Sequence, residues 1–252
     1  MRMLTAGLVV AVAATLAVWQ WSAGSDQQPD SSTSHSENPL RVSLMTSLPI
    51  VWGEGATMND IIGGKATPAP VFVHWQDRYD LQAVDSFEDL DALQPDVVIL
   101  AQPRAMDPAD LAALDQWVRG GGRMVVLTDP ALTWHSHFPL GDNRRPLATG
   151  LLSPLLEHWG LELLAPEDDG AGLVELQMEG LSITTSGIGT FRLHDKSSCN
   201  LSAGKILAEC RIGEGRAILL ADADFLNAEL WESESESAAA QLTDRLIAQV
   251  TR

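Results

Sequence analysis

The chain has few basic residues, and this scarcity limits the partners that it can bind. Lysine and arginine together number 16 against 34 aspartate and glutamate residues, which gives a formal net charge of −18 over 252 residues. Nucleic acids and anionic lipids are both recognised through positively charged surfaces. The composition therefore argues against unassisted binding to either, and we expect no nucleic-acid partner.

Long hydrophobic runs are lacking beyond the first 24 residues, which excludes a polytopic membrane protein. Residues 4–21 are apolar apart from two threonines and one glutamine, and they follow a single positive charge at Arg2. As a helix this stretch reaches roughly 27 Å, enough to span a bilayer with Trp19 and Trp21 at the interface. The same stretch, followed by Ser22-Ala23-Gly24, also describes a secretory signal peptide. Both interpretations remain open.

Either interpretation exports the rest of the chain. We expect it to face the periplasm from the inner membrane, anchored through residues 1–24, or to be released into the periplasm if they are cleaved. Residues 25–40 are polar and too poor in apolar side chains to fold, so they form a disordered tether. Residues 41–252 are then the exported domain, long enough to bury a proper core.

Cysteine is also scarce. The two present, Cys199 and Cys210, lie eleven residues apart around a turn-like Ser-Ala-Gly stretch. In an oxidising compartment they would close a small loop, a disulfide that contributes roughly 2–3 kcal/mol through the unfolded state. The alternative is two unrelated thiols, one exposed and one on a buried strand. Export favours the disulfide.

The clearest structural pattern is a strand, a helix and a second strand between residues 96 and 130. Residues 97–101 and 124–127 are continuous apolar runs, typical of strands covered on both faces. Between them Asp107-Pro108 favours a helix start, and Gly120-Gly121-Gly122 ends the helix after Arg119. Short links of this kind predict a right-handed parallel crossover.

The remaining patterns extend this unit on both sides. Strands are predicted at 42–48, 81–84 and 161–164, and helices begin at 69, 151 and 238. Two hairpins follow, the first pairing 174–178 with 181–185 and the second pairing 206–210 with 217–220. The predicted fold class is α/β, with a mostly parallel sheet flanked by helices, as in flavodoxin-like or class I amidotransferase-like folds, and β-hairpins in the C-terminal half.

Several catalytic motifs are absent from the sequence. It has no Gly-x-Ser-x-Gly elbow, no His-Glu-x-x-His and no phosphate-binding loop. We therefore expect no catalytic residue, no metal, no cofactor and no enzymatic activity.

Candidate ligand-binding residues follow from the expected sheet. Open parallel sheets bind ligands beyond the carboxyl ends of their strands. A small polar or sugar-like ligand would there find tryptophans for stacking and polar groups for hydrogen bonds. The candidates near those ends are Trp52, Glu54, Gln102, Arg104, Asp129, Trp134 and His135.

Other interpretations of these residues stay open. Asp129 and Gln102 also suit a role in tying down loops, with the tryptophans as partly buried packing. A weaker hypothesis makes Asp129, Glu54 or His135 the acid and base of an envelope hydrolase. His135 and His137 could share a metal, but no third ligand has a recognisable spacing. Asp222 and Asp224 could hold a divalent cation, although capping of the turn after residue 221 is the simpler explanation.

Residues 113–123 and the strand ending at Asp129-Pro130 resemble the gliding-motility-associated (GldG-type) auxiliary proteins of ABC transporters. Residues 212–216, running into 221–227, are similar to the closing segment of glutamine-amidotransferase-like domains. The resemblance implies a tethered, exported α/β domain that works beside an ABC permease and ATPase or another envelope assembly.

The chain departs from these families in two respects. The amidotransferase nucleophile cysteine is missing, which argues against glutamine hydrolysis. The membrane span near the carboxyl end of the gliding-type proteins is also missing, so docking to a permease could differ. The favoured function is a non-catalytic auxiliary or scaffold component, and the alternative is a periplasmic domain that binds a small ligand.

Overall fold

A computed structural model describes residues 39–167, 172–195, 197–230 and 236–252. All of these residues belong to the unit formed by residues 37–252. The predicted signal peptide or anchor and nearly all of the predicted tether lie outside the described residues. Within the described ranges, no helix has the length and apolar character needed to cross a membrane.

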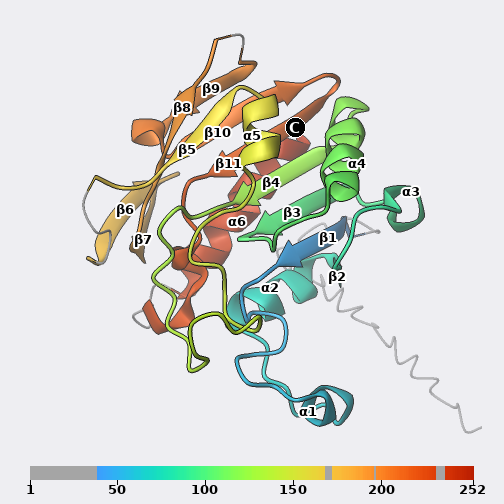
Figure 1. The fold of residues 1–252 in the computed structure, drawn as a ribbon, viewed down its shortest axis with the longest axis vertical. Coiled ribbons are helices and arrows are strands. Elements are labelled where there is room, and N and C mark those ends of the chain that lie inside the picture. The colour runs from blue at the N-terminus through green and yellow to red at the C-terminus, as the bar shows by residue number, and fades with distance from the viewer. Residues whose placement is uncertain (1–38, 168–171, 196, 231–235) are drawn as a thin grey trace, which may run out of the picture. The chain divides into compact units, whose positions relative to one another are not determined.

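The centre of the unit is a seven-stranded sheet with the strand order β2-β1-β3-β4-β11-β10-β9 (Figure 1). The first five strands in this order are parallel, β10 is antiparallel to β11, and the edge strand β9 is antiparallel to β10. Two smaller two-stranded sheets pair β5 with β8 and β6 with β7. This arrangement confirms the predicted fold class, including the hairpins in the C-terminal half. The strands are β1 Arg41–Thr46, β2 Asp80–Ala83, β3 Val97–Ala101, β4 Arg123–Leu127, β5 Leu161–Leu164, β6 Val174–Met178, β7 Leu181–Thr185, β8 Thr190–Leu193, β9 Cys199–Ser202, β10 Leu207–Ile212 and β11 Gly215–Leu220.

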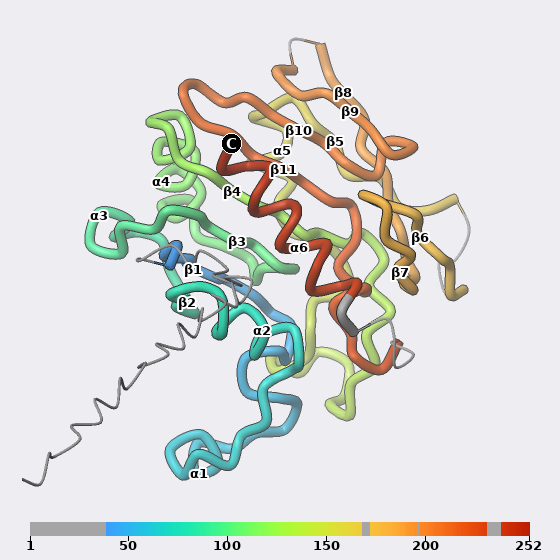
Figure 2. The backbone as a smooth tube through the Cα atoms, turned by 180° about the vertical axis from the view of Figure 1, so that it is seen from behind, coloured from blue at the N-terminus to red at the C-terminus, as the bar shows by residue number. Residues whose placement is uncertain are grey.

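Helices cover both faces of the main sheet. Figure 2 shows α2 and α6 on one face, and Figure 1 shows α4 and α5 on the other. Two hydrophobic clusters correspond to these two layers, one containing Trp75 of α2 with Leu246 of α6, the other containing Leu114 of α4 with Leu155 of α5. The helices are α1 Met58–Ile62, α2 Pro70–Arg78, α3 Leu90–Leu93, α4 Pro108–Arg119, α5 Ser153–His158 and α6 Glu236–Thr251, with 3-10 turns η1 Ala203–Lys205, η2 Asp224–Leu226 and η3 Ala228–Leu230.

The apolar pattern of each strand follows from this double cover. All five residues of β3 are buried, because its alternate side chains enter the two different clusters. β3, α4 and β4 form the parallel crossover that the sequence predicts, and α4 ends at Arg119 as expected. Of the predicted helix start at Asp107-Pro108, Pro108 holds the first helical position, but the Asp107 side chain makes no capping hydrogen bond.

Both predicted hairpins form. β10 and β11 pair closely, joined by the two residues Gly213 and Glu214, and β11 rejoins the main sheet beside β4. β5 forms as predicted. It pairs with β8 in a separate sheet, and β8 carries no clear sequence signal. The first hairpin, β6 with β7, is confirmed.

The order of the parallel strands creates an opening at one edge of the sheet. The chain leaves β1 toward α2 on one face, whereas it leaves β3 toward α4 on the opposite face. Adjacent connections that diverge in this way leave a crevice beyond the carboxyl ends of β1 and β3, where ligands bind in folds of this class.

Candidate functional site

A pocket of about 620 Å³ lies at this edge of the sheet. Its floor is the carboxyl end of β1, its sides are the loop 47–57 and the end of β2 at 83–85, and its rim includes the loop between β4 and α5. Trp52, Glu54 and Arg104 all line it, so the structure brings three of the seven candidate residues together.

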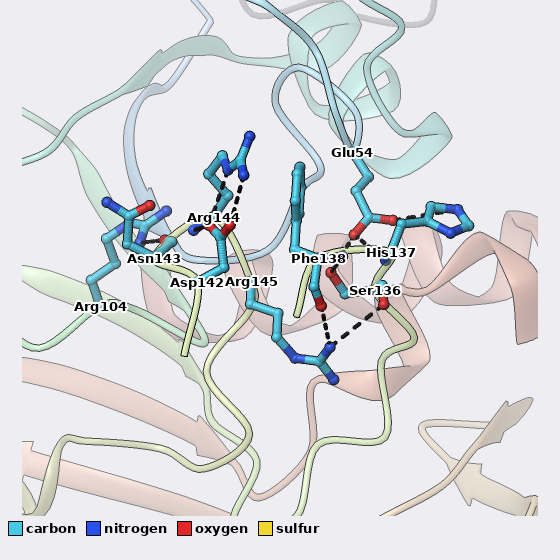
Figure 3. A network of polar contacts seen from close by, with 9 residues as sticks. All are labelled: Glu54, Arg104, Ser136, His137, Phe138, Asp142, Asn143, Arg144 and Arg145. Carbon is cyan, nitrogen blue, oxygen red and sulfur yellow. Dashed lines mark hydrogen bonds and ion pairs between the residues drawn. The ribbon is translucent and has the colours of Figure 1, made fainter. Parts of the chain in front are cut away.

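Glu54 joins the two loops that form the rim (Figure 3). Its Oε1 atom accepts hydrogen bonds from the Ser136 hydroxyl and, at 3.0 Å, from the backbone N–H of His137. The Nε2 atom of His137 lies 3.9 Å from the other carboxylate oxygen. Hydrogen bonds to a charged acceptor are stronger than neutral ones. Glu54 therefore holds the β4–α5 loop against the loop that follows β1.

The β4–α5 loop at the rim is also held in shape by contacts among its own residues. Arg145 donates to the carbonyl oxygen of Phe138 at 2.7 Å, and Arg144 donates to the Asp142 carboxylate at 2.6 Å while lying 4.0 Å from the centre of the Phe138 ring. The hydrogen bonds from Arg144 lower the pKa of Asp142 to about 2. Arg104, which follows β3, donates to the carbonyl oxygen of Asn143 at 2.7 Å (Figure 3). The rim of the pocket on this side therefore consists of polar side chains that hydrogen bonds hold in place.

The pocket presents three groups that remain available to a ligand. Trp52 is 50% exposed, so one indole surface is open for stacking. Among the described residues, Arg104 uses one of its five N–H groups, for the carbonyl oxygen of Asn143. Asp85 has no hydrogen-bond or ion-pair partner in the described part of the chain. An aromatic surface, a cation and an anion within one pocket suit a small polar molecule.

Sequence reasoning did not include Asp85, Phe138 or Arg144 in this site. Asp85 directly follows the predicted strand 81–84, so the rule that located the other candidates at carboxyl ends of strands would also have found it. Phe138 and Arg144 belong to an irregular loop without periodicity, and no sequence pattern locates them.

Gln102 and Asp129 do not line the pocket, because both are fully buried behind it. The Gln102 side chain donates to the carbonyl oxygens of Asp129 at 3.1 Å and Leu147 at 2.9 Å, and it accepts from the Asp129 N–H at 2.8 Å. These bonds tie the ends of β3 and β4 to the rim loop. Gln102 therefore has the loop-holding role that the sequence left open as an alternative.

Asp129 belongs to a cluster of three buried carboxyl groups with Asp222 and Asp224, which follow β11. Asp129 accepts from the N–H groups of Ala131 at 2.7 Å and Ala223 at 3.3 Å. Asp222 Oδ1 accepts from the N–H of Asp224 at 3.0 Å, which is the turn-capping role expected of it.

The same carboxyl groups also hold the strands that surround them. Asp222 accepts from the hydroxyl of Thr185 at 2.9 Å, and Asp224 accepts from the N–H of Thr133 at 2.7 Å and from the hydroxyl of Ser186 at 3.2 Å. The cluster thus connects β7, β11 and the β4–α5 loop.

Burial dominates the acid–base behaviour of this cluster. Together with the neighbouring charge of Asp222, it raises the pKa of Asp129 to about 9. Burial likewise raises the pKa of Asp222 to about 7 and the pKa of Asp224 above its ordinary value. No group of three His, Cys, Asp or Glu residues in the described ranges is arranged to hold a metal ion. Asp129 therefore holds its proton at neutral pH, and all three carboxyl groups act as internal hydrogen-bonding groups.

Trp134 and His135 lie away from the pocket. Trp134 is partly buried and packs against the hydrophobic cluster under α6, as the packing alternative expected. His135 is exposed, and its ring meets the ring of His137 edge to face with centroids 5.2 Å apart. Neither residue contributes to the pocket lining.

Cys199 and Cys210 lie far from these loops in the order of the sheet, on the paired strands β9 and β10. The structure contains a disulfide between them, with the two Sγ atoms 1.95 Å apart. Both residues are buried in the cluster on the α4 side of the sheet. The bond fixes the edge strand β9 to the rest of the sheet.

Comparison with known families shows which family the chain belongs to. Residues 39–165, which contain β1 to β5 and the pocket, match the auxiliary family described as "ABC-type uncharacterized transport system". The chain belongs to this family. It is accordingly an auxiliary component of an ABC-type transport system. No curated protein matches the sequence.

Solved structures are similar to this auxiliary protein at low sequence identity. The N-terminal domain of mmIFT52 is 16% identical, with a TM-score of 0.50 over 84% of this chain and 97% of that one. The exo-β-1,4-mannosidase Op5Man5 from Opitutaceae bacterium strain TAV5 is 10% identical, with a TM-score of 0.49 over 84% of this chain and 36% of that one. The GH42 β-galactosidase Gan42B from G. stearothermophilus (E323A variant) is 14% identical, with a TM-score of 0.46 over 84% of this chain and 30% of that one. At 16% identity the likeness to the mmIFT52 domain concerns the fold alone.

Proposed function

We propose that the chain is a non-catalytic auxiliary domain that works on the periplasmic side of the inner membrane, beside the permease and ATPase of an ABC-type transport system. Membership of the auxiliary family is the observation that carries this proposal. The disulfide between Cys199 and Cys210 supports an oxidising compartment, as does the predicted export segment. The closer resemblance to the gliding-motility type stays a prediction.

The polar groups around the pocket support a role without catalysis. Ser47, the serine in the pocket lining, donates its hydroxyl to the carbonyl oxygen of Gln102 at 2.6 Å. Glu54 already accepts two hydrogen bonds, and no histidine or cysteine is among the described residues that line the pocket. A nucleophile activated by a neighbouring base, which hydrolases of the serine and cysteine types require, therefore has no counterpart in this lining. A pocket lining without an activated nucleophile is consistent with a scaffold role.

Purification of the tagged full chain from its own cells in a mild detergent tests the proposal. We expect an ABC permease and its ATPase to be recovered with it in a constant ratio. The matched control carries residues 1–40 on an unrelated exported domain, and it should recover neither subunit. Isolation of the full chain alone and monomeric, or equal recovery by the control, would refute the proposal.

The open face of Trp52 and the free groups of Arg104 and Asp85 favour a second candidate, the binding of a small polar ligand. Tryptophan fluorescence would be titrated with monosaccharides, amino acids and dicarboxylates. A saturating change that Trp52→Phe removes and Trp134→Phe retains would support this candidate. A response that both variants retain would place the ligand elsewhere and reject it.

A further inference from the structure

Three arginines are aligned across neighbouring strands at the edge of the sheet that lies opposite the pocket. Arg123 begins β4, and Arg216 pairs in register with Arg123 on one side and with Arg211 of β10 on the other. In-register residues of neighbouring strands point to the same face. Val125 and Ile218, two residues further along their strands, place this face on the side covered by α6.

Arg211 and Arg216 are especially close. The N–H of Arg211 donates to the carbonyl oxygen of Ser198 at 3.1 Å, and the N–H of Arg216 donates to that of Gly122 at 3.1 Å. The two arginines thus form a non-hydrogen-bonded antiparallel pair, in which Cα atoms are about 4.5 Å apart. Like charges directly opposite each other destabilise a sheet.

In the described ranges of the protein, this pair has no ion-pair partner. Neither side chain makes an ion pair or a hydrogen bond there, and both are exposed. Arg123, by contrast, interacts electrostatically with Asp96. The two arginines without an ion-pair partner in the described ranges therefore lie on β10 and β11, although the protein as a whole has an excess of 18 negative charges.

The same two arginines line a pocket of about 280 Å³. This volume exceeds that of a water molecule several-fold, enough for a small ion. The one carboxylate side chain among the lining residues, Glu209, accepts a hydrogen bond from Gln249 at 2.8 Å. The other polar lining residues are donors or donor–acceptors, namely Ser198, Asn200 and Arg252.

We propose that Arg211 and Arg216 form a binding site for a phosphate group. Planar guanidinium groups bind the oxygens of phosphate through paired hydrogen bonds, and such charge-assisted bonds are the stronger class. A bound anion also removes the repulsion between the two arginines. The net charge of the chain opposes a broad interaction with polyanions, but one phosphate group requires only this local pair. The phosphate group comes either from a free phosphate ion or from the phosphodiester headgroup of a lipid.

Thermal unfolding and calorimetric titration of the full chain in detergent test the site. The probes are inorganic phosphate and glycerophosphoglycerol, which carries the phosphodiester of a lipid headgroup, with sodium chloride adjusted to keep the ionic strength constant. We expect at least one probe to raise the Tm of the wild type. We expect Arg211→Gln/Arg216→Gln to bind that probe about 100-fold more weakly, since each charge-assisted bond contributes about a tenfold effect.

Two further variants make the test specific. Arg245→Gln/Lys205→Gln removes the same total charge outside the pocket, so it should retain the full response. Arg211→Lys keeps the charge but loses the planar fork, and it should bind about tenfold more weakly even if the double variant does not fold. A response to inorganic phosphate alone identifies a free ion, and a response to the diester identifies a headgroup. Absence of any wild-type response, or equal responses in the wild type and Arg211→Lys, would overturn the proposal.

Discussion

The buried carboxyl cluster makes the stability of this protein depend on pH in an unusual direction. Asp129 has a folded-state pKa of about 9, well above the value of about 3.9 in an unfolded chain. Between these values the folded protein holds a proton that the unfolded chain has released. The stabilisation is therefore complete below about pH 4 and is lost as the pH rises toward 9. Paired surface carboxylates act in the opposite sense, but they titrate near or below pH 4.

Asp129→Asn isolates this contribution, because the amide stays neutral at every pH. Each retained proton changes the free energy of unfolding by about 1.4 kcal/mol per pH unit. Between pH 5 and pH 8 the wild type should thus lose up to about 4 kcal/mol more than the variant loses. The variant itself starts from a lower stability, since the N–H of Ala223 loses its acceptor.

Urea unfolding at several pH values measures the two slopes. Asp91→Asn, which removes the same formal charge from an exposed position, serves as the control and should keep the wild-type slope. Parallel stability curves for the wild type and Asp129→Asn between pH 5 and pH 8 would refute the assignment of a retained proton to Asp129.

Three other predictions concern the rim loops, the disulfide and one close backbone contact. Glu54→Ala should speed amide hydrogen exchange over residues 136–145 with little change in the global Tm, because it removes bonds that connect only two loops; unchanged exchange would refute this. Cys199→Ser/Cys210→Ser should lower the free energy of unfolding by about 2–3 kcal/mol, and wild-type cysteines in intact cells should resist alkylation until reduced. Gly215→Ala should destabilise the protein by about 1–3 kcal/mol in urea, since the new Cβ would lie 2.0 and 2.4 Å from two backbone carbonyl oxygens; Gly172→Ala, which meets nothing within 4 Å, should not.

Local signals decided which parts of the fold could be predicted. The strand, helix and strand from Val97 to Leu127 combine apolar runs with proline and glycine boundaries, and all three elements form where expected. The pairing of β5 with β8 could not be predicted, because both strands are four residues long and their contact spans about thirty residues. Short strands gain their identity from tertiary packing more than from intrinsic preference.

The candidate site, like the fold, could be predicted from the sequence only in part. The rule that ligands meet the carboxyl ends of parallel strands places Trp52, Glu54 and Arg104 in one pocket. The rule does not distinguish residues that face the pocket from those that turn inward, so Gln102 and Asp129 were grouped with them although both are fully buried. That distinction depends on backbone direction after each strand, for example the positive φ of 42° at Gln102.

The most direct test of the central claim is functional reconstitution with the transport system itself. The ABC permease and ATPase that the full chain recovers would be placed in proteoliposomes with and without the chain, and ATP hydrolysis and transport would be compared. An auxiliary component should change the transport rate, or the ATP used per transported molecule, in proportion to the chain added until its binding saturates. Identical rates and stoichiometry at every amount of added chain would contradict the claim.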